Sequence, residues 1–201
     1  GGFVEGMWSN FRNLEKQHGQ AAALEIGHAA ERSIGQIEEF LDERGIDAWF
    51  KQGGYMTVST SEAQDGAWDG QIEALGQAGV GEHAKVLDRA EVQAVCRSPR
   101  FREAALFDDT ATIQPARLAF GLRQALIDEG VMLFENSPVT AMNDSPSGVT
   151  VWTPGGKVTA GRAVLASGAA LAGFGSPVRD KVTIASSHMV ITEPVPDVLE
   201  K

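Results

Sequence analysis

The segment at residues 79–84, GVGEHA, has the spacing of a dinucleotide-binding loop, G-x-G-x-x-A. Such a loop binds a pyrophosphate only where a strand precedes it and a helix follows, because the phosphate then meets the N-terminus of that helix. Here a helical pattern, QIEALGQA, precedes the match and the strand-like AKVL follows it. The order of elements is reversed, so we assign no nucleotide site to residues 79–84.

Residue types that bind metals or act as nucleophiles are sparse. The histidines at positions 18, 28, 83 and 188 show neither H-x-x-x-H nor H-E-x-x-H spacing, so we predict no metal site. The chain lacks both a G-x-x-x-x-G-K-[ST] loop and a G-x-S-x-G motif. The single cysteine, Cys96, lies in a helix-like segment and is predicted to be a buried structural thiol. One cysteine forms no internal disulfide, which fits a reducing compartment, and we predict a cytoplasmic protein.

The stretch AVLASGAA at residues 163–170 starts as an apolar strand and ends in small residues only. Small residues at the end of a strand let another surface approach the backbone closely. In open α/β folds, ligands bind just beyond the carboxyl ends of the strands. Tight packing of a helix on a strand also selects small residues, so the residues alone leave both interpretations open.

The elements that must position these residues follow from periodicity and capping signals. Residues 13–44 predict one long helix or two in sequence, and residues 48–59 a strand broken at Gly53–Gly54. Asp88 followed by Glu91 predicts a capping box, as does Ser61 followed by Gln64. The box at Ser61 opens a predicted helix that runs to about Leu75, and the box at Asp88 opens one that runs to about Val95. Residues 103–109 are a predicted strand.

The second half of the chain reads as α/β. Pro115 and Gly130 bound the clearest helix, and VMLFE at 131–135 follows as a predicted buried strand. GVTVWT and KVTA form a predicted hairpin around the turn at residues 154–156. Further strands are predicted at 162–167 and 182–193.

The succession FDDTATIQPARLAFGLRQALIDEGVMLFENSPVTAM, GVTVWTPGGKVTAGRAVLASGAA and SSHMVITEPVP resembles FAD-dependent oxidoreductases of the D-amino-acid oxidase type, which include glycine and sarcosine oxidases. The opening GGFVEGMW is similar to the end of that family's R-N-G-G segment. The resemblance implies an α/β fold with α+β parts. A partial FAD-binding layer of the glutathione-reductase type would join a substrate-binding mixed sheet with helices.

The same resemblance implies site residues. Val139 matches a position whose backbone meets the adenine ring, and Ala166, Ser167 and Gly168 match a turn that packs on the adenosine and diphosphate side of FAD. Gly1 and Gly2 match glycines beside the diphosphate and the isoalloxazine ring. Ser167 stands where the family more often has Thr.

The resemblance also implies how the chain is divided. Residues 1–12 and 107–175 would form a partial FAD-binding domain, and residues 13–106 and 176–201 a partial substrate-binding domain. The family's G-x-G-x-x-G motif would precede residue 1 and its last sheet strands would follow residue 201, so we expect an internal fragment of a flavoprotein. Such a fragment alone would be inactive. Apolar edges exposed in it would favour self-association, so an oligomer is compatible with the sequence.

The implied reaction is oxidation of an amine or amino acid by hydride transfer to FAD. Candidate substrate contacts are Tyr55, the only tyrosine, and Trp8, which closely follows Gly2. No residue is singled out as catalytic. The net charge of −10 argues against nucleic-acid partners, and no apolar run is long enough for a transmembrane helix. Two alternatives remain: a cofactor-free accessory or binding subunit with the same fold, and a nicotinamide-dependent Rossmann enzyme.

Overall fold

The computed structural model describes residues 2–168, 170, 179–186, 188 and 193. The chain divides into two compact units, residues 1–133 and residues 134–201. This division differs from the predicted grouping of residues 107–175. The two units are defined by contacts within the chain and not by what they bind. The assignment of segments to a cofactor domain and a substrate domain therefore stays a prediction.

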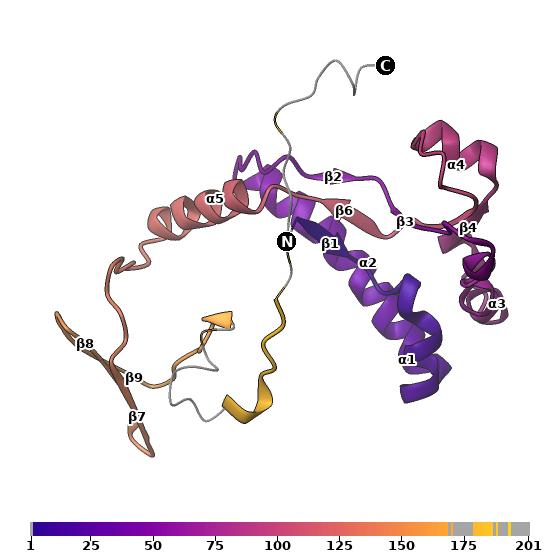
Figure 1. Ribbon diagram of the computed structural model, residues 1–201. Helices are drawn as coiled ribbons and strands as arrows, with labels where there is room; N and C mark the ends of the chain where they lie inside the picture. Colours follow the sequence, from indigo (N-terminus) through magenta and orange to yellow (C-terminus); the bar gives the residue numbers. More distant parts are fainter. Residues whose placement is uncertain (1, 169, 171–178, 187, 189–192, 194–201) are drawn as a thin grey trace. The chain divides into compact units, whose positions relative to one another are not determined.

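Unit 1 contains five helices and two antiparallel sheets among its described residues (Figure 1). The helices are α1 (Phe11–His18), α2 (Gln20–Glu43), α3 (Asp69–Gln77), α4 (Arg89–Val95) and α5 (Pro115–Asp128). One sheet has the order β1 (Phe3–Glu5), β6 (Thr110–Thr112), β2 (Lys51–Gln52). The other has the order β3 (Tyr55–Val58), β5 (Ala104–Phe107), β4 (Ala84–Leu87).

Two segments of the chain, residues 51–58 and 104–112, each contribute one strand to both sheets of unit 1. The amides of Gly53 and Gly54 both donate to the Thr110 carbonyl, at 3.1 and 3.0 Å, so two residues oppose one and form a bulge. Gly54 has φ +79°, and a Cβ there would lie 2.7 Å from the Phe107 carbonyl oxygen. The predicted break at Gly53–Gly54 is confirmed, and it separates β2 from β3.

Side chains of β5 alternate between two cores. Ala105 and Phe107 face a cluster with helices α1 and α3, whereas Ala104 packs with Leu87 and Val92 of the α4 side. The capping box of α4 is formed as predicted: the Glu91 amide donates to Asp88 Oδ1 at 2.9 Å and the Asp88 amide to Glu91 Oε2 at 3.0 Å. The sheet is therefore covered on both faces.

Unit 2 is built around a three-stranded antiparallel sheet of β7 (Ala141–Ser145), β8 (Gly148–Thr153) and β9 (Gly156–Ala160). The hairpin of β8 and β9 is confirmed, with Thr153 opposite Gly156. Strand β7 was not predicted. Its sequence, AMNDS, does not alternate between apolar and polar residues and is mostly exposed, so only the pairing with β8 reveals the strand.

Four sequence expectations are wrong in detail. Residues 131–135 and 162–167 form no strands, and their apolar side chains are largely exposed, because no described strand pairs with either segment. Ser61 precedes only a short 3-10 helix, Glu62–Gln64, and its side chain makes no capping hydrogen bond. The amide of Thr60 instead donates to Gln64, and α3 begins only at Asp69. Cys96 is exposed, because it follows the last turn of α4 in extended backbone. The strand predicted at 182–193 stays a prediction: residues 182–186, 188 and 193 are in no strand, and residues 187 and 189–192 lie outside the described residues.

The long helix α2 contains Gly27, and the structure explains this residue. A Cβ at Gly27 would lie 2.3 Å from Cζ3 of Trp8, because the indole ring packs directly on the helix backbone. Nothing lies within 4 Å of a Cβ at Gly35 in the same helix. Glycine lowers the stability of a helix interior relative to alanine. Position 27 is nevertheless glycine because the Trp8 ring occupies the space that a side chain would need.

These two glycines give a matched prediction. Gly35→Ala should stabilise the protein by about 1 kcal/mol through helix propensity. Gly27→Ala should destabilise it by about 2 kcal/mol, because the added methyl overpacks the core. Urea denaturation of both variants measures the difference, and equal effects of the two substitutions would contradict the packing argument.

Candidate functional site

The segment that ends the predicted strand 162–167 exposes its backbone. Ala166, Ser167 and Gly168 are all exposed, and Gly168 has φ +56°. Among the described residues, no heavy atom lies within 4 Å of a Cβ built at Gly168, so no described side chain fills the space beside it. The backbone here is open to a long ligand.

Val139 precedes β7 in the same unit and is partly exposed. The next residue, Thr140, donates from both its amide and its hydroxyl to the Trp152 carbonyl, at 2.8 and 3.2 Å. These bonds fix the backbone next to Val139 while its own side chain stays accessible. Val139 thus sits on an anchored segment, as a backbone contact to a ligand would require.

Gly2 lies in unit 1, before strand β1, and Gly1 lies outside the described residues. The Ile113 amide donates to the Gly2 carbonyl at 2.8 Å, which extends the β1–β6 ladder. Gly2 has φ +123°, and a Cβ there would lie 3.3 Å from the Ile113 carbonyl oxygen. A side chain is disfavoured at this position on both counts.

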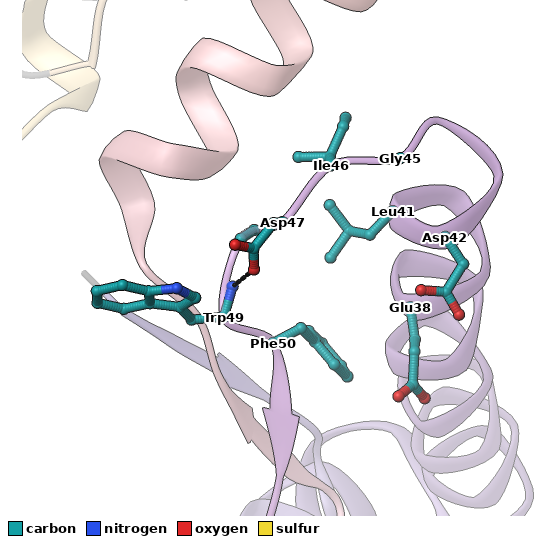
Figure 2. Close-up of a pocket in the computed structure, with 9 residues that line it drawn as sticks. Glu38, Leu41, Asp42, Gly45, Ile46, Asp47, Trp49 and Phe50 are labelled. Carbon is teal, nitrogen blue, oxygen red and sulfur yellow. Dashed lines mark hydrogen bonds between the residues drawn. The ribbon is translucent and has the colours of Figure 1, made fainter.

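A surface pocket of about 410 Å³ lies between the C-terminal end of α2 and the loop leading to β2 (Figure 2). Its lining comprises Glu38, Leu41, Asp42, Gly45, Ile46, Asp47, Ala48, Trp49 and Phe50. Trp49 has φ +52°, and the Arg117 guanidinium lies 4.7 Å from its ring centroid. Arg117 also pairs with the Asp47 carboxylate, so the loop is bound to the start of α5. None of the predicted site residues lines this pocket.

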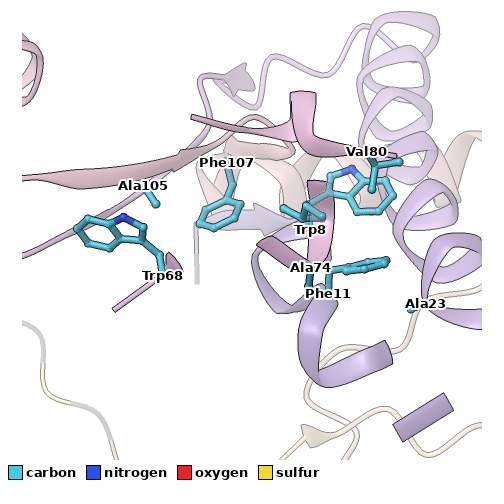
Figure 3. Packing of buried hydrophobic residues seen from close by; sticks show 9 residues of the cluster. Trp8, Phe11, Ala23, Trp68, Ala74, Val80, Ala105 and Phe107 are labelled. Carbon is cyan, nitrogen blue, oxygen red and sulfur yellow. The ribbon is translucent and has the colours of Figure 1, made fainter. Parts of the chain in front are cut away.

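Trp8 is completely buried in the main core of unit 1 (Figure 3). Its ring stacks on His83 with centroids 4.5 Å apart and meets His28 edge-on at 5.0 Å. The His83 Nδ1 lies 3.1 Å from the Asp108 carboxylate. The indole Nε1 of Trp8 is buried and has no hydrogen-bond partner in the part of the chain that the structure describes. Trp8 therefore fills the core rather than an open site.

Tyr55 begins strand β3 and lies opposite Phe107 of β5. Its side chain is 41% exposed, whereas Phe107 is buried in the Trp8 cluster. The structure thus places Tyr55 and Trp8 in one unit, with only Tyr55 at the surface. Gly2 shares this unit, whereas Val139 and residues 166–168 belong to unit 2, and each unit is described by itself.

Asp109, which the sequence did not single out, holds the start of the chain. Its Oδ2 accepts the Trp8 amide at 3.0 Å, and its carbonyl accepts the Gly6 amide at 2.7 Å. Burial raises the pKa of the Asp109 carboxyl, and the hydrogen bond from the Trp8 amide opposes that rise. The partners of Asp109 lie about a hundred residues away in the chain, so nothing in the sequence indicated this contact. The only local signal was the acidic pair Asp108–Asp109.

A second network joins the loop after β3 to β5. Arg102 binds Asp65 through Nε at 3.1 Å and Nη2 at 2.7 Å, and the buried Ser59 hydroxyl donates to Asp65 Oδ1 at 2.5 Å. The bond from Arg102, followed by that from Ser59, lowers the pKa of Asp65. Arg102 therefore has a structural role, because it binds a carboxylate of the loop that follows β3.

The Asp65 network predicts acid sensitivity. A carboxyl with a lowered pKa in the folded state adds stability above its unfolded pKa, and the protein loses it as pH falls through the folded value. Asp65→Asn should therefore flatten the decline of the urea midpoint below about pH 4. Asp42→Asn, at an exposed position of α2, is the matched control. An unchanged acid decline in Asp65→Asn would contradict the assignment.

Comparison with known proteins decides the family. A family model described as FAD dependent oxidoreductase matches residues 2–201. The chain belongs to this family.

The segment GVGEHA at residues 79–84 follows α3 and leads into β4. This is the reversed order expected from the sequence, so residues 79–84 are no dinucleotide fingerprint.

Individual relatives agree with the family. The chain is 24% identical to the probable oxidoreductase OrdL of Haemophilus influenzae over 199 residues, which covers 96% of this chain and 45% of that protein. It resembles glycine oxidase from Geobacillus kaustophilus with a TM-score of 0.64 and 23% identity, over 71% of this chain and 40% of that one. For glycine oxidase from Bacillus cereus the TM-score is 0.65 at 16% identity, over 86% and 45%. The chain thus spans less than half the length of these relatives.

FAD is the cofactor of the family, and the described residues fit it. The diphosphate and flat rings of FAD need close approach to backbone, which the open segment at residues 166–168 and the glycine at position 2 allow. The predicted fold class, α/β with α+β parts, is confirmed by the same structural neighbours.

Two other findings bear on the site. Among the described residues, no group of three His, Cys, Asp or Glu side chains is arranged to hold a metal ion. No helix in the described part of the chain has the length and apolar character needed to cross a membrane.

Proposed function

We propose that this chain is part of a flavin-dependent oxidoreductase that oxidises an amine or amino acid. The family match over residues 2–201 is the observation that carries the proposal. Solved neighbours whose names give a substrate class are glycine oxidases, an L-proline dehydrogenase and L-amino acid deaminases, which supports a carbon–nitrogen bond as the target.

FAD, when bound, supplies the hydride acceptor at N5 of its isoalloxazine ring. With FAD bound, the oxidation would take a hydride from the carbon next to nitrogen and release the N–H proton to solvent, which leaves a C=N bond in the product. This chemistry requires the protein to orient substrate and exclude competing reactions, and it needs neither a protein nucleophile nor a metal. The residues of this chain therefore act by binding.

We assign cofactor contacts to Gly1, Gly2, Val139, Ala166, Ser167 and Gly168. The open backbone at residues 166–168 supports the assignment of that segment, and the anchored backbone beside Val139 supports that of Val139. Tyr55 is our proposed substrate contact, because its phenol is accessible at the edge of β3 and can donate to a carboxylate. Trp8 packs in the core cluster that includes Phe107, the strand partner of Tyr55.

The experiment is anaerobic reduction of the flavin in the full-length holoprotein. Glycine, L-proline, sarcosine and simple alkylamines are added in turn, and bleaching of the visible flavin absorbance is recorded. We expect at least one amine to bleach the flavin, while lactate, a 2-hydroxy acid of similar size, does not. Reduction by lactate or by a reduced nicotinamide alone would overturn the proposed substrate class.

A further inference from the structure

The buried carboxylate of Asp109 has no part in the chemistry proposed above. It is 2% exposed, and its neighbour Asp108 is engaged with His83. An ionisable group is seldom kept inside a protein unless its hydrogen bonds repay the cost of burial. The carboxylate and the backbone carbonyl of Asp109 both accept hydrogen bonds from the segment that begins with Gly2.

Residues 2–8 are held on residues 109–113 at both ends. At the far end Asp109 accepts the amides of Gly6 and Trp8, the first through its carbonyl and the second through its carboxylate. At the near end the Ile113 amide donates to the Gly2 carbonyl. Strand β1 between them pairs with β6 in register, with Glu5 opposite Thr110. The position of Gly2 along β6 is thereby fixed by the contact at Asp109.

The contact at Asp109 excludes any side chain from Gly6. A Cβ at Gly6 would lie 1.8 Å from Asp109 Oδ2 and 2.7 Å from the Asp109 carbonyl oxygen. Both the carboxylate and the backbone would have to move to admit a methyl group. Gly6 does not have a positive φ. Glycine is therefore required there because Asp109 lies so close, and not because of the backbone conformation.

We infer that Asp109 is a positioning residue that sets the register of residues 2–8 on β6 and so holds Gly2 for contact with the flavin. The inference rests on the proposed function, since Gly2 is a cofactor contact only in a flavoprotein. Asp109 acts through Gly6 and Trp8 and does not itself touch the cofactor. The contact requires an acceptor oxygen at the place of Oδ2, not a negative charge.

The test compares Asp109→Ala, Asp109→Asn and the control Asp108→Asn in the full-length protein. Each apoprotein is titrated with FAD by flavin fluorescence, and the visible circular dichroism of the bound flavin is recorded. Asp109→Ala should raise the Kd for FAD roughly tenfold or more, as expected for loss of a buried hydrogen bond, and alter the dichroism. Asp109→Asn should restore both within about threefold, and Asp108→Asn should match the wild type. If Asp109→Ala does not fold, Asp109→Ser replaces it with the same expectations.

Several results would overturn the inference. One is an Asp109→Ala protein that unfolds more easily yet binds FAD with unchanged Kd and dichroism, which is a merely structural role. Another is an Asp109→Asn protein that binds no better than the alanine variant. A wild-type protein that binds no FAD would instead overturn the proposed function. In that case, hydrogen exchange at the Trp8 amide tests whether Asp109 holds residues 2–8, independently of FAD. Faster exchange in Asp109→Ala but not in Asp109→Asn supports this role, and equal rates overturn it.

Discussion

Trp8→Ala should destabilise the protein by about 4 kcal/mol, the largest effect on stability that we expect from a single truncation. The indole ring is completely buried, packs on the backbone of Gly27 and stacks on His83. Its loss would leave a cavity that helix α2 and strand β5 fill only by moving. Urea denaturation followed by circular dichroism measures the change.

Trp49→Ala is the matched control for this substitution. Trp49 is also a tryptophan of unit 1, but its side chain is 64% exposed, so its truncation should cost no more than about 1 kcal/mol. Similar losses for Trp8 and Trp49 would contradict the assignment of Trp8 to the core. Retention of stability by Trp8→Ala would return Trp8 to the candidates for an open site.

Ala166→Trp in the full-length protein should weaken FAD binding roughly a hundredfold, or about 2.8 kcal/mol. Ala166 is exposed, so an indole there meets no core residue and folding should be unaffected. The ring would instead occupy the space through which the cofactor approaches the backbone. Flavin fluorescence titration of the apoprotein gives the Kd.

Val158→Trp on the exposed side of β9 is the control for Ala166→Trp. It places the same indole ring in the same unit at a position that we assign to no site, and the FAD affinity should stay within about threefold of the wild type. Equal affinities of the two variants would remove residues 166–168 from the cofactor site.

Local signals predicted the ends of α4 and α5, whereas the box predicted at Ser61 opens no α-helix. Asp88 and Glu91 form the predicted box, and Pro115 and Gly130 bound α5 within two residues, because each cap is decided by neighbours in the chain. The bulge at Gly53–Gly54 was readable for the same reason. Helix propensity and capping operate over a few residues, so a single sequence contains the necessary information.

Contacts between distant residues were not readable. Residues 131–135 have the composition of a buried strand, but strands need partners, and none of the described residues supplies one. Gly6 and Asp109 are unremarkable in the sequence, because their contact joins positions about a hundred apart. The family resemblance supplied Gly2, Val139 and residues 166–168, whereas periodicity alone left the last of these between ligand approach and tight packing.

The central claim is that this chain contributes to an FAD site. The most direct measurement is a visible absorbance spectrum of the purified full-length protein, followed by denaturation and mass spectrometry of any released chromophore. The account predicts the absorbance of an oxidised flavin and FAD as the bound molecule. A colourless protein that yields no flavin on denaturation and takes up none when FAD is added would contradict it.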